Sequence, residues 1–183
     1  MAEDEEYFAY LKSLQQVQLP RWADLPQFDL YMDQVVQYVN ELLAPLDLGE
    51  LTATMVNNYV KKGVITPPTK KKYSRGQVAN ILIIAILKSV FSLDEIAAGI
   101  DYQLQGREKQ QAFDAFIMNF AGALQQANTN FAGGVLINKV TKEDTIKVQS
   151  AMVSLAINAV LQKMLVSAMV TMVMPKPTGK KEK

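Results

Sequence analysis

The chain contains no cysteine and no histidine. The absence of cysteine excludes disulfides, thiolate metal sites and a cysteine nucleophile. The absence of histidine removes the commonest general base and any Ser-His or Cys-His triad, and the two absences together remove the usual nitrogen and sulfur ligands of zinc and copper. Carboxylate chemistry with magnesium remains formally open, but no spacing of acidic residues suggests it. We therefore expect a protein that is not an enzyme and holds no cofactor.

The composition is that of a folded protein, with 49% hydrophobic and 20% charged residues in a chain of 183. This length suits one domain with a substantial core, or a small module with a helical extension. The first residues, MAEDEEYFAYLK, are acidic and lack the basic start and long apolar run of a signal peptide. We expect a cytoplasmic protein.

Positive charge is concentrated in the middle of the chain, although the formal net charge is only +1. Residues 1–50 contain ten acids and two bases, residues 51–93 contain seven bases and no acid, and the remainder contains ten bases and eight acids. A lysine run by itself is most often a solvated loop. An ordinary solvated surface mixes both signs, however, so the acid-free block indicates a surface for a polyanion.

The sequence predicts one helix over residues 3–16 and a second from an N-cap at Asp29 to the residues before Pro45. It predicts a third over residues 52–62, at the start of the acid-free block. Gly63 is expected to end the third of these helices in a left-handed conformation. Between the first two helices, LPRWADLPQFDL is an irregular connection in which Trp22 is expected to pack and not to bind a ligand.

After Gly63, the segment VITPPTKKKY combines β-branched residues, two prolines and lysines, which predicts a short extended pair joined by a turn, a small β wing. Capping boxes then predict two helix starts, at Ser74 with Gln77 and at Ser92 with Glu95. Further on, apolar residues at helical spacing in REKQQAFDAFIMNFAGALQQA predict a helix with one buried face. NTNFAGG then predicts a loop, and Thr141 with Asp144 is predicted to begin a last helix that ends at about residue 174. The buried face comprises Phe113, Phe116, Ile117, Phe120 and Leu124.

The segment MVNNYVKKGVITPPTKKKYSRGQVANILIIAILKSVFSLDEI resembles the winged helix-turn-helix of MerR-type regulators. The features that carry the resemblance are Tyr59 and Gly63 at Tyr-x-x-x-Gly spacing, the prolines and lysines of the wing, Tyr73-Ser74, and FSLDEI from Phe91. From LPRW to FSLDEI, about residues 19–100, the chain is also similar to a family of small cytoplasmic proteins of Gram-positive bacteria described only as a domain of unknown function. The resemblance implies a DNA-binding module over residues 28–102. MerR-type recognition helices typically carry Arg-Tyr-Tyr where this chain has Asn57-Asn58-Tyr59, so base preferences do not transfer.

DNA recognition needs cations for the phosphates and polar side chains that reach base edges. Asparagine amides can pair with adenine, so Asn57 and Asn58 on the polar face of the 52–62 helix are candidate base readers, although either can be an ordinary surface residue. The lysines and Arg75 are placed for the flanking backbone. The predicted DNA-binding residues are Thr54, Asn57, Asn58, Lys61, Lys62, Lys70, Lys71, Lys72, Tyr73 and Arg75.

The remaining segments are predicted to be an N-terminal helix and arm (1–27), a helical part that dimerises (103–174) and a disordered basic tail (175–183). The last helix is apolar enough that a membrane span must be weighed, but Lys163 near its middle and the short uncharged stretch after it argue against one. Burial in the core or in a homodimer interface is favoured, and an apolar small-molecule effector is a further alternative. We expect a dimeric DNA-binding transcriptional regulator; the other classes are a scaffold that binds an acidic protein and a membrane-associated protein.

Overall fold

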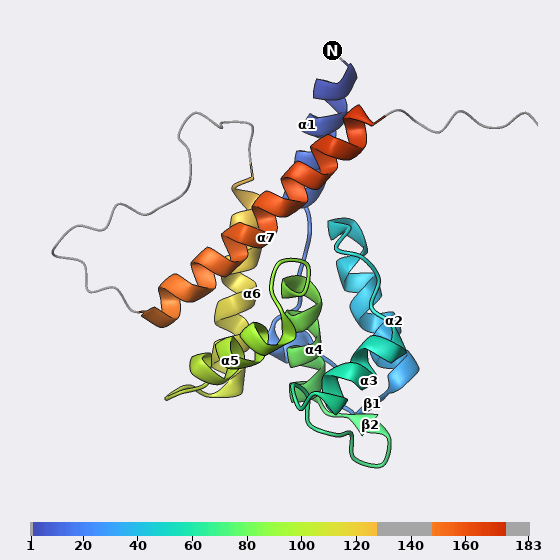
Figure 1. Ribbon diagram of the computed structural model, residues 1–183, viewed down its shortest axis with the longest axis vertical. Coiled ribbons are helices and arrows are strands. Elements are labelled where there is room, and N and C mark those ends of the chain that lie inside the picture. The colour runs from blue at the N-terminus through green and yellow to red at the C-terminus, as the bar shows by residue number, and fades with distance from the viewer. Residues whose placement is uncertain (1, 128–147, 175–183) are drawn as a thin grey trace, which may run out of the picture.

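The protein is mainly helical, with one small antiparallel sheet. The computed structural model describes residues 2–127 and 148–174, which comprise seven α-helices, two 3-10 turns and two short strands (Figure 1). Along the chain these elements are α1 (Ala2–Gln15), η1 (Trp22–Asp24), β1 (Leu30–Tyr31), α2 (Met32–Leu43), η2 (Ala44–Leu46), α3 (Ala53–Lys61), β2 (Lys72–Tyr73), α4 (Arg75–Leu87), α5 (Leu93–Gln103), α6 (Lys109–Gln125) and α7 (Val148–Val173). The predicted fold class, mainly helical with a little β structure, is confirmed at this level.

Helix α4 lies at the centre because it is apolar on all sides. Every residue from Val78 to Leu87 except Asn80 is buried. The predicted capping box starts the helix: the Ser74 backbone N–H donates to Gln77 Oε1 at 2.8 Å, and Tyr73 and Val78 are both buried beside it. Each buried isoleucine or leucine contributes about 2 kcal/mol of hydrophobic stabilisation relative to exposure. Among the described helices, α4 therefore has the most buried residues, nine against five in α6.

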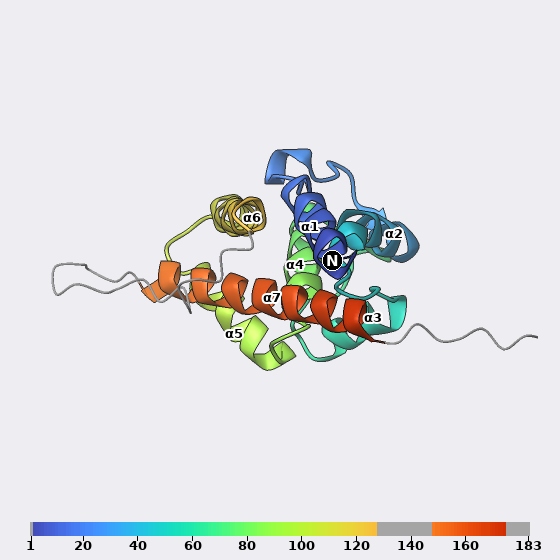
Figure 2. The same cartoon turned by 90° about the horizontal axis from the view of Figure 1, so that it is seen from above.

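The buried side chains form one continuous core that runs from α1 to α7. Helix α7 lies across α6 and extends beside α1 away from the body (Figures 1 and 2). Its start is fixed to the end of α5 because Gln103 Nε2 donates to the Gln149 carbonyl at 2.8 Å and Gln149 Nε2 donates to the Tyr102 carbonyl at 2.9 Å. The division into four segments stays a prediction. The predicted NTNFAGG loop, the helix start at Thr141 and the basic tail lie outside the described residues.

Two predictions about the region before α2 and α4 are corrected. Asp29 is not the N-cap of α2: Leu30 and Tyr31 form β1, and the Tyr31 N–H donates to Gln34 Oε1 at 2.9 Å where the helix begins. The wing pairs with itself only at the bridge between Thr69 and Lys72, and its strand β2 pairs with β1, with Leu30 opposite Tyr73. Proline has no backbone N–H to donate to a strand ladder, so the segment with Pro67 and Pro68 cannot supply the partner strand and a distant segment does.

Tyr59 on α3 leads to the first testable prediction. Its side chain is 3% exposed, and within residues 2–127 and 148–174 its buried hydroxyl has no hydrogen-bond partner. Removing an unsatisfied buried hydroxyl relieves its desolvation penalty, so Tyr59→Phe should raise the free energy of unfolding by about 1 kcal/mol in urea titrations. Burial also raises the pKa of Tyr59 above its ordinary value of 10.0.

The pH dependence gives this prediction a second readout. Below pH 10 the hydroxyl is neutral in both states, so its raised folded-state pKa has no effect on stability. Above pH 10 the unfolded chain ionises first, and the free energy of unfolding falls as pH rises through the folded pKa. The advantage of Tyr59→Phe should therefore widen above pH 10. Tyr31→Phe is the control at neutral pH, since Tyr31 is 48% exposed and its replacement should bring no gain in stability. A Tyr59→Phe variant that is less stable at neutral pH would contradict the prediction.

Candidate nucleic-acid interface

Helix α3 has defined ends and two distinct faces. Thr52 caps its start by accepting the Met55 N–H on its side chain at 3.2 Å. Gly63, with φ of 74°, ends it: its N–H donates to the Val60 carbonyl at 3.0 Å, and the next N–H reaches the Tyr59 carbonyl at 2.9 Å. Val56 and Tyr59 are buried, whereas the opposite face is exposed. The predicted helix, cap and polar face are confirmed, and the exposed residues are Thr54, Asn57, Asn58, Lys61 and Lys62.

Two side chains that sequence reasoning missed hold the connection into α3. Asn40 of α2 makes a reciprocal pair with Leu51: its Nδ2 donates to the Leu51 carbonyl at 2.9 Å and its Oδ1 accepts the Leu51 N–H at 2.8 Å. Lys88 Nζ donates to the Glu50 carbonyl at 3.2 Å, and burial lowers the pKa of Lys88. The only sequence signal was an amide at the edge of the apolar face of α2. These contacts fix where α3 begins relative to α2 and α4.

The lysine run forms a tight turn with an unusual backbone. Thr69 and Lys72 exchange two backbone hydrogen bonds, of 3.1 and 2.9 Å, and the two residues between them have φ of 51° (Lys70) and 64° (Lys71). A two-residue turn with both central residues at positive φ is the type I′ hairpin turn, for which Asn-Gly is strongly preferred. Two lysines here cost conformational energy, and residues in such regions concentrate at functional sites. The turn therefore holds two cations at its tip against the local preference.

The ten predicted DNA-binding residues differ in exposure. Seven are exposed: Thr54, Asn57, Asn58, Lys61, Lys62, Lys70 and Lys71. Lys72 and Arg75 are half-buried: Lys72 Nζ lies 4.8 Å from the centroid of the Tyr31 ring, and Arg75 Nε donates to the Pro26 carbonyl at 3.3 Å. These two cations are thus held in place by β1 and the segment before it.

Tyr73 does not belong to the exposed surface. Its side chain is 2% exposed, it stands opposite Leu30 in the sheet, and burial raises the pKa of its hydroxyl. Its ring packs into the core beside the first turn of α4, as expected of the residue before an N-cap. The buried ring of Tyr73 anchors the turn to the core and offers little surface for a contact, so the prediction that Tyr73 contacts DNA stays a prediction and is less favoured than for the seven exposed residues.

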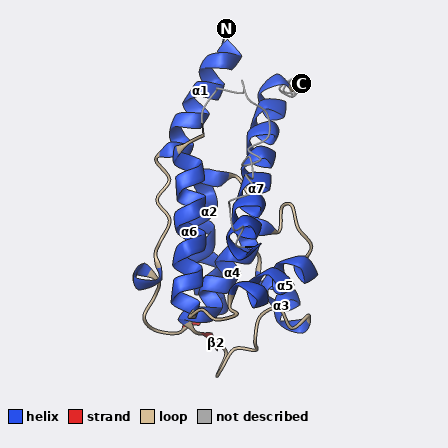
Figure 3. Ribbon diagram, turned by 90° about the vertical axis from the view of Figure 1, so that its left-hand side faces the viewer, coloured by secondary structure: helices blue, strands red, loops and turns tan. Residues whose placement is uncertain are grey.

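The exposed residues lie at one end of the molecule. Helix α3 and the turn before β2 both lie at the end opposite the projecting helices α1 and α7 (Figures 1 and 3). Within residues 2–127 and 148–174, none of Lys61, Lys62, Lys70 and Lys71 is paired with a carboxylate. Asn57 and Asn58 also make no hydrogen bond within the described part of the chain, so four ammonium groups and two amides are available at this end. We call the seven exposed residues the basic end: Thr54, Asn57, Asn58, Lys61, Lys62, Lys70 and Lys71.

Comparison with known proteins places this end inside a family segment. Residues 20–119 match the family described as Domain of unknown function (DUF1836). The chain belongs to this family. The DUF1836 segment runs from the residues before η1 into α6, so it contains the whole basic end and leaves α1 and α7 outside. The expected similarity to a domain of unknown function is confirmed, while the likeness to MerR-type regulators and the Gram-positive origin stay predictions. No curated protein and no solved structure matches the chain.

The turn backbone gives a prediction about stability. Replacing Lys70-Lys71 by Asn-Gly supplies the residues that positive φ favours, so this variant should be more stable than a Lys70→Gln/Lys71→Gln variant by about 1 kcal/mol. Both variants remove the same two charges, so the comparison isolates the backbone effect. Urea titration of the two variants measures it, and equal stabilities would contradict a strained turn.

Proposed function

We propose that the protein is a double-stranded DNA-binding transcriptional regulator that uses the basic end as its interface. The observation that carries the proposal is the placement of seven exposed candidate side chains at one end, with no carboxylate paired to the lysines among the residues described. A protein surface that concentrates unpaired cations attracts phosphate backbones by releasing counterions. In this proposal the fold of residues 28–102 is a MerR-like winged helix-turn-helix.

Helix α3 acts as the recognition helix in the major groove. It is exposed along the face that carries Asn57 and Asn58, and neither amide has a hydrogen-bond partner within the described part of the chain. An asparagine amide can donate to adenine N7 and accept from adenine N6, which only the major groove presents together. Lys61 and Lys62 at the helix end contact the adjacent phosphates. Asn40 contributes by positioning the start of the helix.

The Thr69–Lys72 turn acts as the wing on the phosphate backbone. Its tip carries Lys70 and Lys71, both exposed, and its base is anchored by β1 and the buried Tyr73. Because the turn fixes the Cα positions of the two lysines before binding, less conformational entropy is lost when they meet the phosphates. The unfavourable backbone at these two positions is consistent with a requirement for charge at the tip.

The proposed function is tested by measuring DNA affinity as a function of salt. Genomic fragments that the protein selects would serve as the probe, in fluorescence-anisotropy titrations. Lys70→Gln/Lys71→Gln should weaken binding of all fragments and reduce the slope of log K against log[salt] by about 0.9 for each phosphate that the protein no longer neutralises. An unchanged slope in this variant would contradict the wing assignment.

The matched control is Asn57→Ala/Asn58→Ala, which removes base readers and no charge. It should leave the salt slope unchanged and reduce discrimination between selected and random fragments by about 1–3 kcal/mol. If the wild-type chain selects no fragment even at low salt, DNA binding is wrong, and the basic end would then be a surface for an acidic protein.

We further propose that the protein is a homodimer through α7. Apolar side chains recur on one exposed face of this helix in two groups, Val148, Met152 and Leu155, then Val166, Val170 and Val173. Within each group the spacing is three or four residues, and the eleven residues from Leu155 to Val166 make about three helical turns. Residues at these spacings lie on one stripe, and such stripes pack against a second helix. Two copies joined in this way would present two basic ends to a palindromic site.

The alternative is that the exposed apolar stripe of α7 contacts the interior of a membrane. Helix α7 is long and apolar enough to span a membrane, and only 22% of its most apolar stretch of 18 residues is buried inside the protein. Two features favour the soluble fold: Ile157, Val160 and Met164 are buried in the core, and Lys163 Nζ donates to the Ser89 carbonyl at 2.8 Å. A lysine near the middle of a span is unfavourable by roughly 3 kcal/mol, whereas here its charge is bonded at the protein surface. We therefore infer a cytoplasmic location.

The dimer is tested by charging the stripe. Leu155→Glu/Val166→Glu should convert the protein to a monomer in sedimentation equilibrium, because two desolvated carboxylates in an apolar contact cost several kcal/mol. Thr171→Glu is the control, since Thr171 is exposed on the opposite side of the helix and should leave the dimer intact. A wild-type protein that sediments as a monomer would contradict the proposal.

A further inference from the structure

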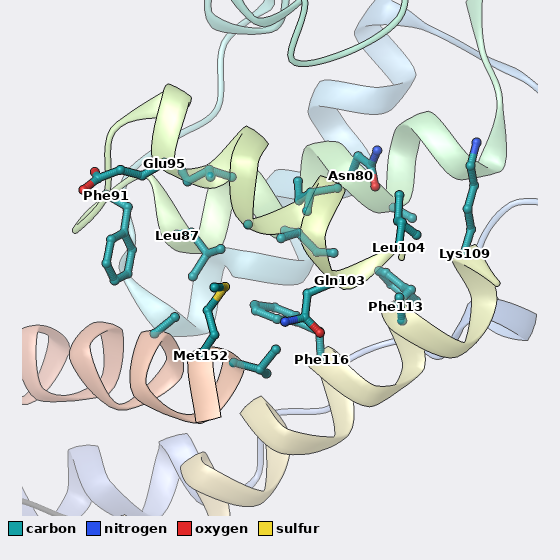
Figure 4. Close-up of a pocket in the computed structure, with 18 of the residues that line it drawn as sticks. Asn80, Leu87, Phe91, Glu95, Gln103, Leu104, Lys109, Phe113, Phe116 and Met152 are labelled. Carbon is teal, nitrogen blue, oxygen red and sulfur yellow. The ribbon is translucent and has the colours of Figure 1, made fainter. Parts of the chain in front are cut away.

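A cavity of about 270 Å³ lies between α4, α5, α6 and α7, away from the basic end (Figure 4). Its walls are predominantly aliphatic and aromatic, with Ile83 and Leu87 from α4, Phe113 and Phe116 from α6 and Met152 from α7. Small-molecule sites are usually apolar hollows with a few polar groups, of about 300–1,000 Å³ for drug-sized ligands. The volume here suits a smaller apolar molecule.

Among the described residues, the amide of Asn80 in the cavity wall has no hydrogen-bond partner. Asn80 is the one residue between Val78 and Leu87 of α4 that is not apolar, and it is half-buried at the cavity. Its amide makes no hydrogen bond among the residues that the structure describes. The Gln103 amide, by contrast, is already bonded to the start of α7 through the Gln149 carbonyl. Asn80 is therefore the amide in the wall that is free to bond a ligand.

The charges around the cavity differ between its two sides. Lys109 is the first residue of α6, where the helix dipole also favours negative charge, and its stem lies 3.9 Å from the position that a Cβ on Gly76 would occupy, one turn before Asn80. Glu95 lies on the other side, and its carboxylate already accepts from the backbone N–H and the hydroxyl of Ser92 (Figure 4). The side with Lys109 and Asn80 thus suits an anionic group.

We propose that this cavity binds a small amphipathic carboxylate, with its hydrocarbon part among the apolar side chains and its carboxylate at Lys109 and Asn80. The Lys109 ammonium and the Asn80 amide nitrogen donate to the two carboxylate oxygens. A primary amine carries a positive charge at neutral pH, so the Lys109 ammonium repels it from this side of the cavity. The proposal concerns ligand binding alone and is independent of whether the basic end binds DNA.

The single tryptophan of the chain gives a direct readout. Trp22 lies in the cavity wall, in edge-to-face contact with Phe113 at 6.0 Å between ring centroids. Titration of the full-length protein with octanoate, octanol and octylamine, each below its aggregation concentration, is followed by Trp22 fluorescence and by the melting temperature. Octanoate should shift both and bind about fivefold more tightly than octanol, and octylamine should bind weakest.

Three variants separate charge, shape and folding. Lys109→Gln should weaken octanoate about fivefold and leave octanol unchanged, because Lys109 is exposed and its removal creates no cavity. Ala112→Leu places three carbons in the cavity and should weaken octanoate and octanol alike while preserving the melting temperature. Lys61→Gln, in the basic end, should bind octanoate like the wild type and show weaker DNA affinity, so the two proposals fail independently.

The proposal is overturned if none of the three probes changes Trp22 fluorescence, or if octanol or octylamine binds as tightly as octanoate. It is also overturned if Trp22 fluorescence depends on protein concentration and on no probe, since the cavity would then be covered by a second copy of the chain. Loss of octanoate binding in Ala112→Leu, with the wild-type melting temperature, supports it.

Discussion

The burial of α4 is the constraint on which the arrangement of the other helices depends. Its nine buried residues have no single apolar face, so other elements must cover it on all sides. Helices α2, α5 and α7 all contact it. Because its capping box begins one residue after β2, the position of α4 also determines where the strand and the Thr69–Lys72 turn emerge. The turn is therefore fixed by the core and not by its own hydrogen bonds alone, which is how two lysines can be held at positive φ.

The sequence predicted those features of the fold that depend on interactions between residues close together in the chain. Both capping boxes, the Gly63 helix end and the buried face of α6 were predictable, since each depends on residues within a few positions of one another. The pairing of β1 with β2 joins segments about forty residues apart and leaves no local trace, so the wing was predicted without this partner. The same pairing buries Tyr73, which is why a residue beside the lysines belongs to the core. The role of Asn40 was hard to predict for the same reason: an amide at the edge of the apolar face of α2 does not indicate its partner, which is a backbone group eleven residues away.

Helix α7 shows a different limit of sequence reading. Its apolar residues are distributed over nearly all sides, so periodicity alone indicates no preferred face and no heptad. The structure divides them: Ile157, Val160, Leu161 and Met164 face the core, whereas the stripe from Val148 to Val173 is exposed. A helix with two apolar faces, one used within the chain and one left open, gives the same sequence signal as a membrane span. Only the buried set distinguishes these cases, and Lys163, which looked like an obstacle to a span, proves to be a contact to the Ser89 carbonyl.

The composition of the turn connects the fold to the basic end. If the turn served only to lead the chain from α3 into β2, Asn-Gly would form it with less strain. Elsewhere in the same segment the residues do suit the backbone, since Pro67 and Pro68 restrict its conformation before the turn. The backbone at positions 70 and 71 favours asparagine and glycine, yet both positions hold lysine. This disagreement at two adjacent positions indicates that positive charge is required there. Helix α3 has no such conflict: its caps, buried face and exposed face all agree. Within the basic end, the strained backbone is thus found in the turn and not in α3, which favours the turn tip as a point of contact with a polyanion.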